Sequence, residues 1–195
     1  MIKNVVFDMG NVLMTFDGPY FCAQFASTPE DAAALQAALF GRPEWALLDS
    51  GTITHETMLR VARAHLDQRL WPELDALFEG WPRFSAPIPA TNELAARLKE
   101  QGYGIYLLSN ASTHVEQQLS HMPSWPLMDG AVISGLERLM KPDPAIYRLL
   151  CERYGLEPSE CLFVDDNADN CEGARAAGMP AVRYCGDVKA IQNAL

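Results

Sequence analysis

Positive charge is scarce in this sequence of 195 residues. It has 15 lysines and arginines against 25 aspartates and glutamates, which gives a formal net charge of -10. Proteins bind nucleic acids and anionic membrane surfaces through clustered cations, so this balance argues against both as partners. A phosphate ligand would also have to find its positive charge locally, at a site built for it.

Long hydrophobic runs are missing as well. No uninterrupted apolar stretch is long enough to cross a bilayer, and Met1–Asn4 leads into the first apolar segment without a basic leader. We therefore expect a cytoplasmic protein that does not associate with membranes.

Cysteine and histidine form no metal-binding pattern. The five cysteines are an odd number without a C-x-x-C pair, which predicts free thiols in a reducing compartment. The four histidines show no ligand spacing, and His114, which lies near a motif described below, is expected to be a surface or helix residue. Any metal site should therefore use oxygen ligands.

The most informative segment is an apolar run that begins at Ile2 and ends at Asp8. The run predicts a buried strand of a parallel sheet, and Gly10 and Asn11 after it allow a tight turn. Ligands bind beyond the carboxyl ends of parallel strands, which is where Asp8 would stand. We interpret Asp8 as a nucleophile.

The segment of residues 15–86 shows helical patterns and no strand alternation between residues 20 and 80. The helices that we expect there cover 29–39, 43–48, a third that Thr54 caps, and 72–78. A proline-rich stretch, 81–89, is expected to be the return linker. This pattern predicts a small helical cap over 15–86, inserted into an α/β core of residues 1–14 and 87–195.

After Pro87 the pattern alternates between helix and strand. The expected helices are 91–101, 145–154 and 170–177, and the expected strands are 105–108, 131–133, 161–164 and 181–184. Such alternation predicts a doubly wound, Rossmann-like parallel sheet.

Two further strands end in polar residues, as the first one does. Ser109-Asn110 follows one and Asp165-Asp166 follows another, while Lys141 precedes a helix. Each residue alone has an ordinary structural explanation, as a helix cap, a surface charge or a turn former. Because the loops of a doubly wound sheet open at one edge, we expect Asp8, Ser109, Lys141 and Asp166 to converge.

Clustered carboxylates repel one another and call for a cation. Oxygen ligands without histidine or cysteine favour Mg²⁺, which Asp8, Asp166 and the Gly10 carbonyl would hold, with Asp165 as a further candidate for the metal site. Lys141 and the N-terminus of the helix after Asn110 would supply further positive charge.

Four segments of the chain resemble the motifs of the haloacid dehalogenase-like hydrolase superfamily. They are Asp8–Val12, Leu108–Asn110, Lys141-Pro142 and Asp165–Asn170. The resemblance covers residues 1–14 and 87–185, and the insertion is similar to the helical cap of that superfamily. The first and last motifs are most similar to a bacterial branch that includes an α-D-glucose-1-phosphate phosphatase.

The resemblance implies a mechanism. Asp8 would attack phosphorus and form an aspartyl-phosphate, with Mg²⁺ between Asp8, the Gly10 carbonyl and Asp166. Asp165 would orient Lys141 or a metal-bound water. The groups that would hold the phosphoryl oxygens are Ser109, Lys141 and the backbone N–H groups beside Asn110.

The sequence departs from the superfamily at two positions. Phosphatases of this superfamily usually carry an acid–base aspartate where this chain has Gly10, and such catalysis is typically worth about 10²–10⁴-fold in rate. We favour the explanation that the leaving group needs little protonation. The alternatives are that a neighbouring side chain or water replaces the missing aspartate, or that hydrolysis is slow or absent. Asn170 also replaces a further aspartate, which makes it a weaker ligand candidate.

Substrate choice is expected to reside in residues 40–51. Trp45 with Phe40 would form an apolar wall, and Asp49 and His55 would hydrogen-bond a sugar. The expected substrate is a small phosphorylated metabolite, a sugar phosphate such as glucose 1-phosphate. We expect a monomer or a weak homodimer.

Three other interpretations remain. A haloacid dehalogenase would attack carbon and has no use for Asp165-Asp166 or a metal. A signalling receiver domain carries its acid pair after the first strand, whereas here the pair follows a late one. A regulatory or binding member of the family without activity is compatible with Gly10.

Overall fold

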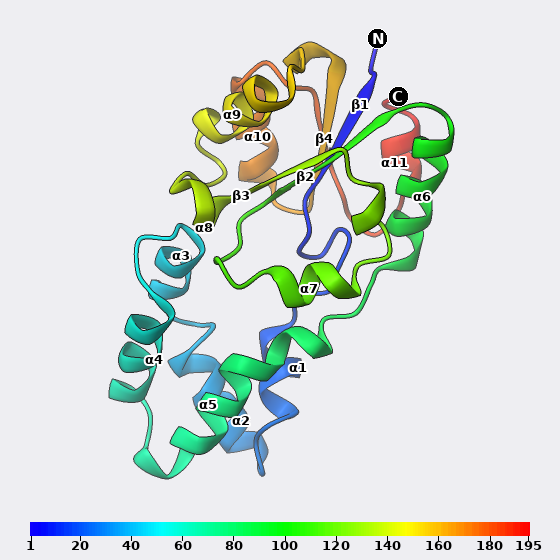
Figure 1. Ribbon diagram of the computed structural model, residues 1–195. Coiled ribbons are helices and arrows are strands. Elements are labelled where there is room, and N and C mark those ends of the chain that lie inside the picture. Colours follow the sequence, from blue (N-terminus) through cyan, green and yellow to red (C-terminus); the bar gives the residue numbers. More distant parts are fainter.

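The computed structural model describes all residues from 1 to 195 and contains one five-stranded sheet flanked by helices (Figure 1). The strands lie in the order β3-β2-β1-β4-β5, and every neighbouring pair is parallel. Their bounds are β1 Asn4–Phe7, β2 Gly104–Ser109, β3 Gly130–Ile133, β4 Cys161–Asp165 and β5 Ala181–Arg183. This sheet confirms the predicted α/β class.

Strand β1 lies at the centre, and its register positions the site. Phe7 pairs with Leu107 of β2 and with Val164 of β4. The residues that follow these three stand side by side at the carboxyl edge of the sheet: Asp8, Leu108 and Asp165.

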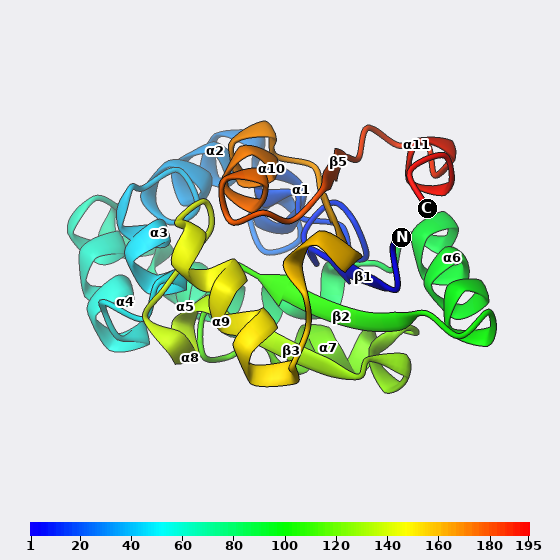
Figure 2. The ribbon, with the colours of Figure 1, turned by 90° about the horizontal axis from the view of Figure 1, so that it is seen from above.

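Helices cover both faces of the sheet. They are α6 Pro89–Glu100, α7 Glu116–His121, α8 Ser134–Glu137, α9 Pro144–Tyr154, α10 Ala168–Ala176 and α11 Lys189–Gln192. Val5 and Phe7 belong to a core cluster with residues of α6, α7 and α11, whereas Val6 belongs to a second cluster with residues of α9 and α10. Figure 2 shows α9 and α10 on one side of the sheet and α6 and α11 on the other. Alternate strand residues therefore serve opposite faces.

The segment of residues 15–86, here called the helical region, contains no strand of the sheet. Its helices are α1 Gly18–Ala23, α2 Pro29–Ala38, α3 Glu44–Asp49, α4 His55–Ala64 and α5 Trp71–Gly80. The Thr54 side chain accepts a hydrogen bond from the Thr57 N–H at 3.2 Å, so this predicted cap is confirmed. The region has its own apolar cluster, which includes Phe21, Leu35 and Leu74.

The chain enters and leaves the helical region through two paired segments. Thr15 N–H donates to the Ala86 carbonyl at 2.8 Å, and Ile88 N–H donates to the Leu13 carbonyl at 2.9 Å. The Ser85 hydroxyl donates to the Thr15 carbonyl at 2.7 Å. These bonds hold the start and the end of the helical region together beside the sheet.

The predicted return linker is shorter than expected. Trp81–Phe84 forms a 3-10 helix. The Trp81 ring packs against Phe21 and Phe16, with centroids 5.2 and 5.5 Å away. Its apolar surface belongs to the helical region, which leaves only Ser85–Ile88 as connection.

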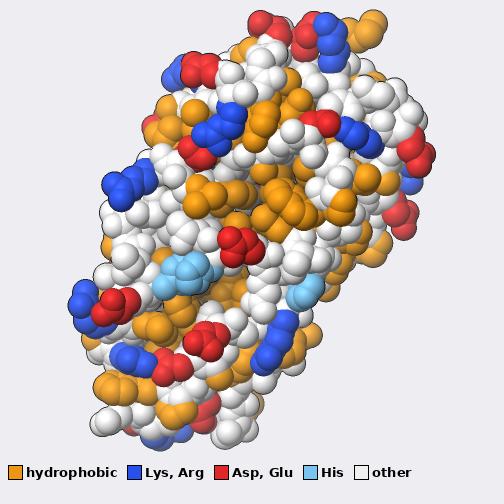
Figure 3. All heavy atoms as spheres, in the orientation of Figure 1, with side chains coloured by type: hydrophobic (Ala, Val, Ile, Leu, Met, Phe, Trp, Pro, Cys, Tyr) orange, Lys and Arg blue, Asp and Glu red, His pale blue; other side chains and the backbone are white.

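No helix combines the length and apolar character that crossing a membrane requires. On the face seen in Figure 3, Lys and Arg side chains are scattered among Asp and Glu and form no basic patch.

Candidate active site

Lys141 is the centre of a buried ion cluster. Its Nζ lies 2.7 Å from Asp8 Oδ1 and 2.6 Å from Asp165 Oδ2, and it donates to the Leu108 carbonyl at 3.1 Å. These contacts use all three ammonium protons. Burial would lower the pKa of Lys141, but the charges of Asp8 and Asp165 outweigh it and raise that pKa. Lys141 therefore remains a cation.

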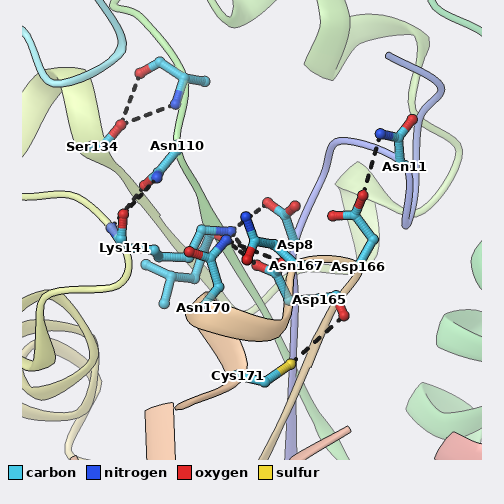
Figure 4. A network of polar contacts seen from close by, with 12 residues as sticks. Asp8, Asn11, Asn110, Ser134, Lys141, Asp165, Asp166, Asn167, Asn170 and Cys171 are labelled. Atoms are coloured by element: carbon cyan, nitrogen blue, oxygen red, sulfur yellow. Dashed lines mark hydrogen bonds and ion pairs between the residues drawn. The ribbon is translucent and has the colours of Figure 1, made fainter. Parts of the chain in front are cut away.

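The backbone of Lys141 is fixed by a side chain from another loop. Asn110 Nδ2 donates to the Lys141 carbonyl, and the Lys141 N–H donates to Asn110 Oδ1, both at 2.9 Å (Figure 4). This pair of bonds joins the loop after β2 to the loop before α9. The side-chain amide of Asn110 is thereby occupied, and it positions Lys141.

Asp165 is completely buried and fully hydrogen-bonded. Besides Lys141, the Asn167 N–H donates to its Oδ1 at 2.8 Å, and Asn170 Nδ2 lies 3.1 and 3.0 Å from its two oxygens. Both oxygens of Asp165 thus have donors from the protein. Asn170, where the superfamily often has an aspartate, acts here as a donor to Asp165.

Three carboxylates form an acidic cluster that suits a metal ion. One oxygen each of Asp8, Asp165 and Asp166 lie within 4.8 Å of one another. Burial raises the pKa of Asp8 to about 6 against the opposing charge of Lys141, and burial and the Asp165 charge raise the pKa of Asp166. A hard cation would offset this repulsion, and the donor set of oxygens fits Mg²⁺.

A cavity of about 280 Å³ lies above the cluster, between the carboxyl edge of the sheet and the helical region. The predicted site residues that line it are Asp8, Gly10, Trp45, Ser109, Asn110, Lys141 and Asp166. Asp165 is the one predicted site residue that does not line it, since it is completely buried behind Lys141. Sequence reasoning therefore identified residues that the fold brings together.

The wall contributed by the helical region differs in part from expectation. Phe16, Trp45 and Trp81 line the cavity and are called the aromatic wall. Phe40 does not line it and instead packs behind Trp45, with centroids 4.6 Å apart, so its prediction as a wall residue is wrong. Trp81 was not predicted as a wall residue because the prolines that follow it indicated a linker. A large aromatic side chain is unusual in an exposed linker, and this could have indicated a packed position.

Two histidines meet at the edge of the cavity. His55 stacks on His114 with ring centroids 3.5 Å apart, and its Nε2 lies 3.3 Å from the Ser112 hydroxyl. His114 is exposed and lines the cavity. His55 does not line it, so the position of His55 does not support its prediction as a sugar-binding residue. Burial and the charge of His114 lower the pKa of His55 to about 4.

The loop after β2 contradicts one prediction. The helix expected after Asn110 is present as α7, but it begins only at Glu116. Its N-terminus is therefore not beside Asn110. The Ala111 N–H, predicted to face phosphate, donates to the Ser134 hydroxyl at 3.0 Å instead.

Comparison with known proteins gives a consistent result. Residues 2–178 match the family described as haloacid dehalogenase-like hydrolase. A curated relative, the sesquiterpene phosphatase astK of Aspergillus oryzae, is 27% identical over 178 residues, which are 91% of this chain and 87% of the relative. The (S)-2-haloacid dehalogenase 4A of Burkholderia cepacia is 31% identical over 137 residues, which are 69% of this chain and 58% of the relative.

Solved structures share the fold. The enzyme bt-2542 of Bacteroides thetaiotaomicron, in a mutant form with magnesium and inorganic phosphate, superposes with a TM-score of 0.76 at 22% identity, covering 96% of each chain. The donor set in this chain fits the same ion, in agreement with the predicted Mg²⁺ cofactor.

Proposed function

Since this chain belongs to the haloacid dehalogenase-like hydrolases, we propose that it is a Mg²⁺-dependent phosphatase of a small sugar phosphate. The observation that carries the proposal is the ion cluster of Lys141, Asp8 and Asp165, beside Asp166, at the floor of a cavity. A fixed cation, a reachable carboxylate and an acid pair suit displacement at an anionic phosphorus.

Asp8 is the nucleophile in this mechanism. Lys141 holds Asp8 Oδ1 at 2.7 Å, which orients the carboxylate at the carboxyl end of β1. Its attack forms a bond to phosphorus while the bond to the leaving oxygen breaks, and water then hydrolyses the aspartyl-phosphate.

Asp8, Asp166 and the Gly10 carbonyl would hold Mg²⁺, since these groups line the cavity. The bound ion supplies charge that shields the approach of a carboxylate to a phosphate. Asp165 positions Lys141, because its own oxygens are already hydrogen-bonded.

We assign Ser109 to the phosphoryl oxygens as a hydrogen-bond donor and Lys141 as a nearby positive charge. Ser109 ends β2 and lines the cavity beside Asp8. The three N–H groups of Lys141 are occupied by Asp8, Asp165 and the Leu108 carbonyl. Lys141 therefore influences the phosphoryl group mainly by orienting Asp8.

Substrate choice is assigned to the helical region, which we propose as a cap over the site. A cavity of about 280 Å³ is at the small end of ligand pockets, which suits a phosphate with one sugar ring. The aromatic wall offers faces for such a ring, and Asp49, His114 and Gln118 offer polar groups to its hydroxyls. Glucose 1-phosphate is the first candidate, because the first and last motifs are similar to the branch that includes a phosphatase for it.

Haloacid dehalogenation is the second candidate function. It is favoured by the similarity to the dehalogenase of Burkholderia cepacia. The acidic cluster favours the phosphatase, because attack on carbon needs no metal to offset three carboxylates.

Phosphate release from a panel of phosphomonoesters tests the proposal. The panel contains glucose 1-phosphate, glucose 6-phosphate and an isoprenoid monophosphate, each with Mg²⁺ and with chelator. A 2-haloacid is assayed under the same conditions for halide release. We expect Mg²⁺-dependent release from sugar phosphates, none from Asp8→Asn, and a phosphorylated Asp8 peptide after acid quench. Haloacid turnover that survives the chelator, or a label elsewhere, would refute the proposal. The isoprenoid monophosphate is included because the relative astK is a sesquiterpene phosphatase and the aromatic wall offers a surface for an apolar chain as well as for a sugar ring.

A further inference from the structure

The proposed reaction lacks a proton donor at the usual place. Gly10 stands where phosphatases of the family usually have an acid, and packing does not require a glycine there. A β-carbon on Gly10 would meet its nearest neighbour, Phe16 Cβ, at 3.9 Å, which is ordinary contact. The acid is therefore either absent or located on another element of the cavity.

The ionisable side chains at the floor of the cavity are already committed. Lys141 spends its three protons on Asp8, Asp165 and the Leu108 carbonyl. Asp8 and Asp166 belong to the acidic cluster that suits a cation. None of these groups is free to protonate a leaving group, which sits on the far side of phosphorus from its attacker.

Asp49 is the remaining carboxyl that lines the same cavity. It ends α3, in the helical region, and it forms no ion pair. We propose that Asp49 is the general acid of the reaction and protonates the leaving oxygen as Asp8 bonds to phosphorus. This inference rests on the proposed phosphatase function.

The surroundings of Asp49 keep a proton on it at neutral pH. Burial raises its pKa to about 8, although hydrogen bonds from the Ser112 N–H and the Trp45 side chain oppose the shift. A carboxylic acid at this pH is a donor, whereas an ordinary aspartate is not. The other ionisable groups that share the cavity are Asp8, His114, Lys141 and Asp166.

The backbone of Asp49 is held against the core. The Ser134 hydroxyl donates to the Asp49 carbonyl at 2.5 Å and accepts from the Ala111 N–H at 3.0 Å. Gly51 reinforces the contact: its φ is +70, and a β-carbon there would lie 2.3 Å from the Gly135 carbonyl oxygen. These contacts fix the end of α3 to the start of α8, and through Ser134 to Ala111 in the loop after β2.

The proton balance closes over the two halves of the reaction. In the first half the Asp8–phosphorus bond forms, the bond from phosphorus to the leaving oxygen breaks, and that oxygen takes the Asp49 proton to become an alcohol. In the second half the Asp49 carboxylate takes a proton from a water molecule while the oxygen of that water bonds to phosphorus. The Asp8–phosphorus bond then breaks, which restores Asp8 and releases inorganic phosphate.

The test compares leaving groups in Asp49→Asn, a variant that keeps shape and hydrogen bonds but holds no acidic proton. We expect kcat/KM for an alkyl phosphate to fall by about 10²–10⁴-fold. For para-nitrophenyl phosphate, whose leaving group needs no proton, kcat/KM should stay within a few-fold, which also shows that the site is folded. The decline of alkyl phosphate turnover above about pH 8 in the parent enzyme should vanish in the variant. Glu56→Gln, which changes an exposed carboxylate of α4, is the matched control and should change neither substrate.

The outcomes separate this inference from the function on which it rests. Equal loss for both substrates would make Asp49 a binding or structural residue and overturn the inference, while the phosphatase proposal stands. A leaving-group-dependent loss in His114→Gln but not in Asp49→Asn would move the acid to His114. No Mg²⁺-dependent phosphate release from any substrate by the parent enzyme would refute the phosphatase, and the inference with it.

Discussion

Replacing Lys141 by methionine tests the ion cluster most directly. The change keeps the length of the side chain but removes the charge between Asp8 and Asp165, whose side chains are 11% and 0% exposed. Removing one partner of a buried ion pair typically costs about 3–5 kcal/mol, because the other charge is left in a poorly solvated place. For a chain of this size, that loss lowers Tm by about 6–20 °C.

The loss should depend on pH, with a definite sign. Lys141 lowers the pKa of Asp8, so in Lys141→Met that pKa rises above its value of about 6. At low pH the carboxyl is protonated in the folded and the unfolded state, and removing the cation costs little. Between pH 3.8 and about 6 the unfolded state ionises while Asp8 stays protonated in both folded proteins, so parent and variant lose stability alike. Above about pH 6, Asp8 ionises beside Lys141 in the folded parent but stays protonated in the folded variant. Stability relative to the parent should therefore fall as pH rises.

Thermal unfolding of metal-free protein, measured at about pH 5 and at about pH 8, checks this reasoning. Lys99→Met is the control, since its contact with Asp129 is partly exposed and surface pairs contribute only about 0–1 kcal/mol. A loss that is equal at the two pH values, or no larger than that of the control, would show that Lys141 does not offset buried carboxylates.

Two further predictions concern the same edge of the sheet. Mg²⁺ at a hundredfold excess over its Kd should stabilise the protein by about 2.7 kcal/mol. The stabilisation should be smaller at acidic pH, because Asp8 must lose its proton to hold the ion. Calorimetry that shows no stabilisation, or a stabilisation that does not depend on pH, would contradict the metal assignment. Gly10→Asp should fold, since a β-carbon fits there, and should restore part of the alkyl phosphate turnover of Asp49→Asn; a double variant as slow as Asp49→Asn alone would mean that an acid at this position cannot reach the leaving oxygen.

The strands and the residues at their ends were predictable because the pattern is local. Apolar runs that stop at a polar residue mark where parallel strands meet solvent, and Asp8, Ser109 and Asp166 follow from that rule. The helices α2, α3, α4 and α5 of the helical region were also found, within a few residues, from their caps and prolines, whereas α1 was not predicted. The division into core and cap and the roles of the site residues stay predictions.

The parts that sequence reasoning missed depend on contacts between distant segments. Nothing in the local sequence says that the amide of Asn110 holds the backbone of Lys141 across 31 positions. The late start of α7 follows from a turn at Thr113–Val115, which the polar sequence after Asn110 does not distinguish from a helix start. Asp49 was identified only as a sugar ligand, because its desolvation arises from neighbours on other elements.

The paired segments at Thr15 and Ala86 have a consequence for how the enzyme would work. They form the sole covalent connections between the sheet, which carries the proposed nucleophile, and the helical region, which carries the proposed acid Asp49. Any swing of the helical region must pivot there, breaking the Ser134 contact while leaving Lys141 and Asp8 in place. In an open molecule, Asp8 would keep its orientation, but Asp49 would be too far away to protonate the departing alcohol. Efficient catalysis would therefore require the helical region to close over the substrate.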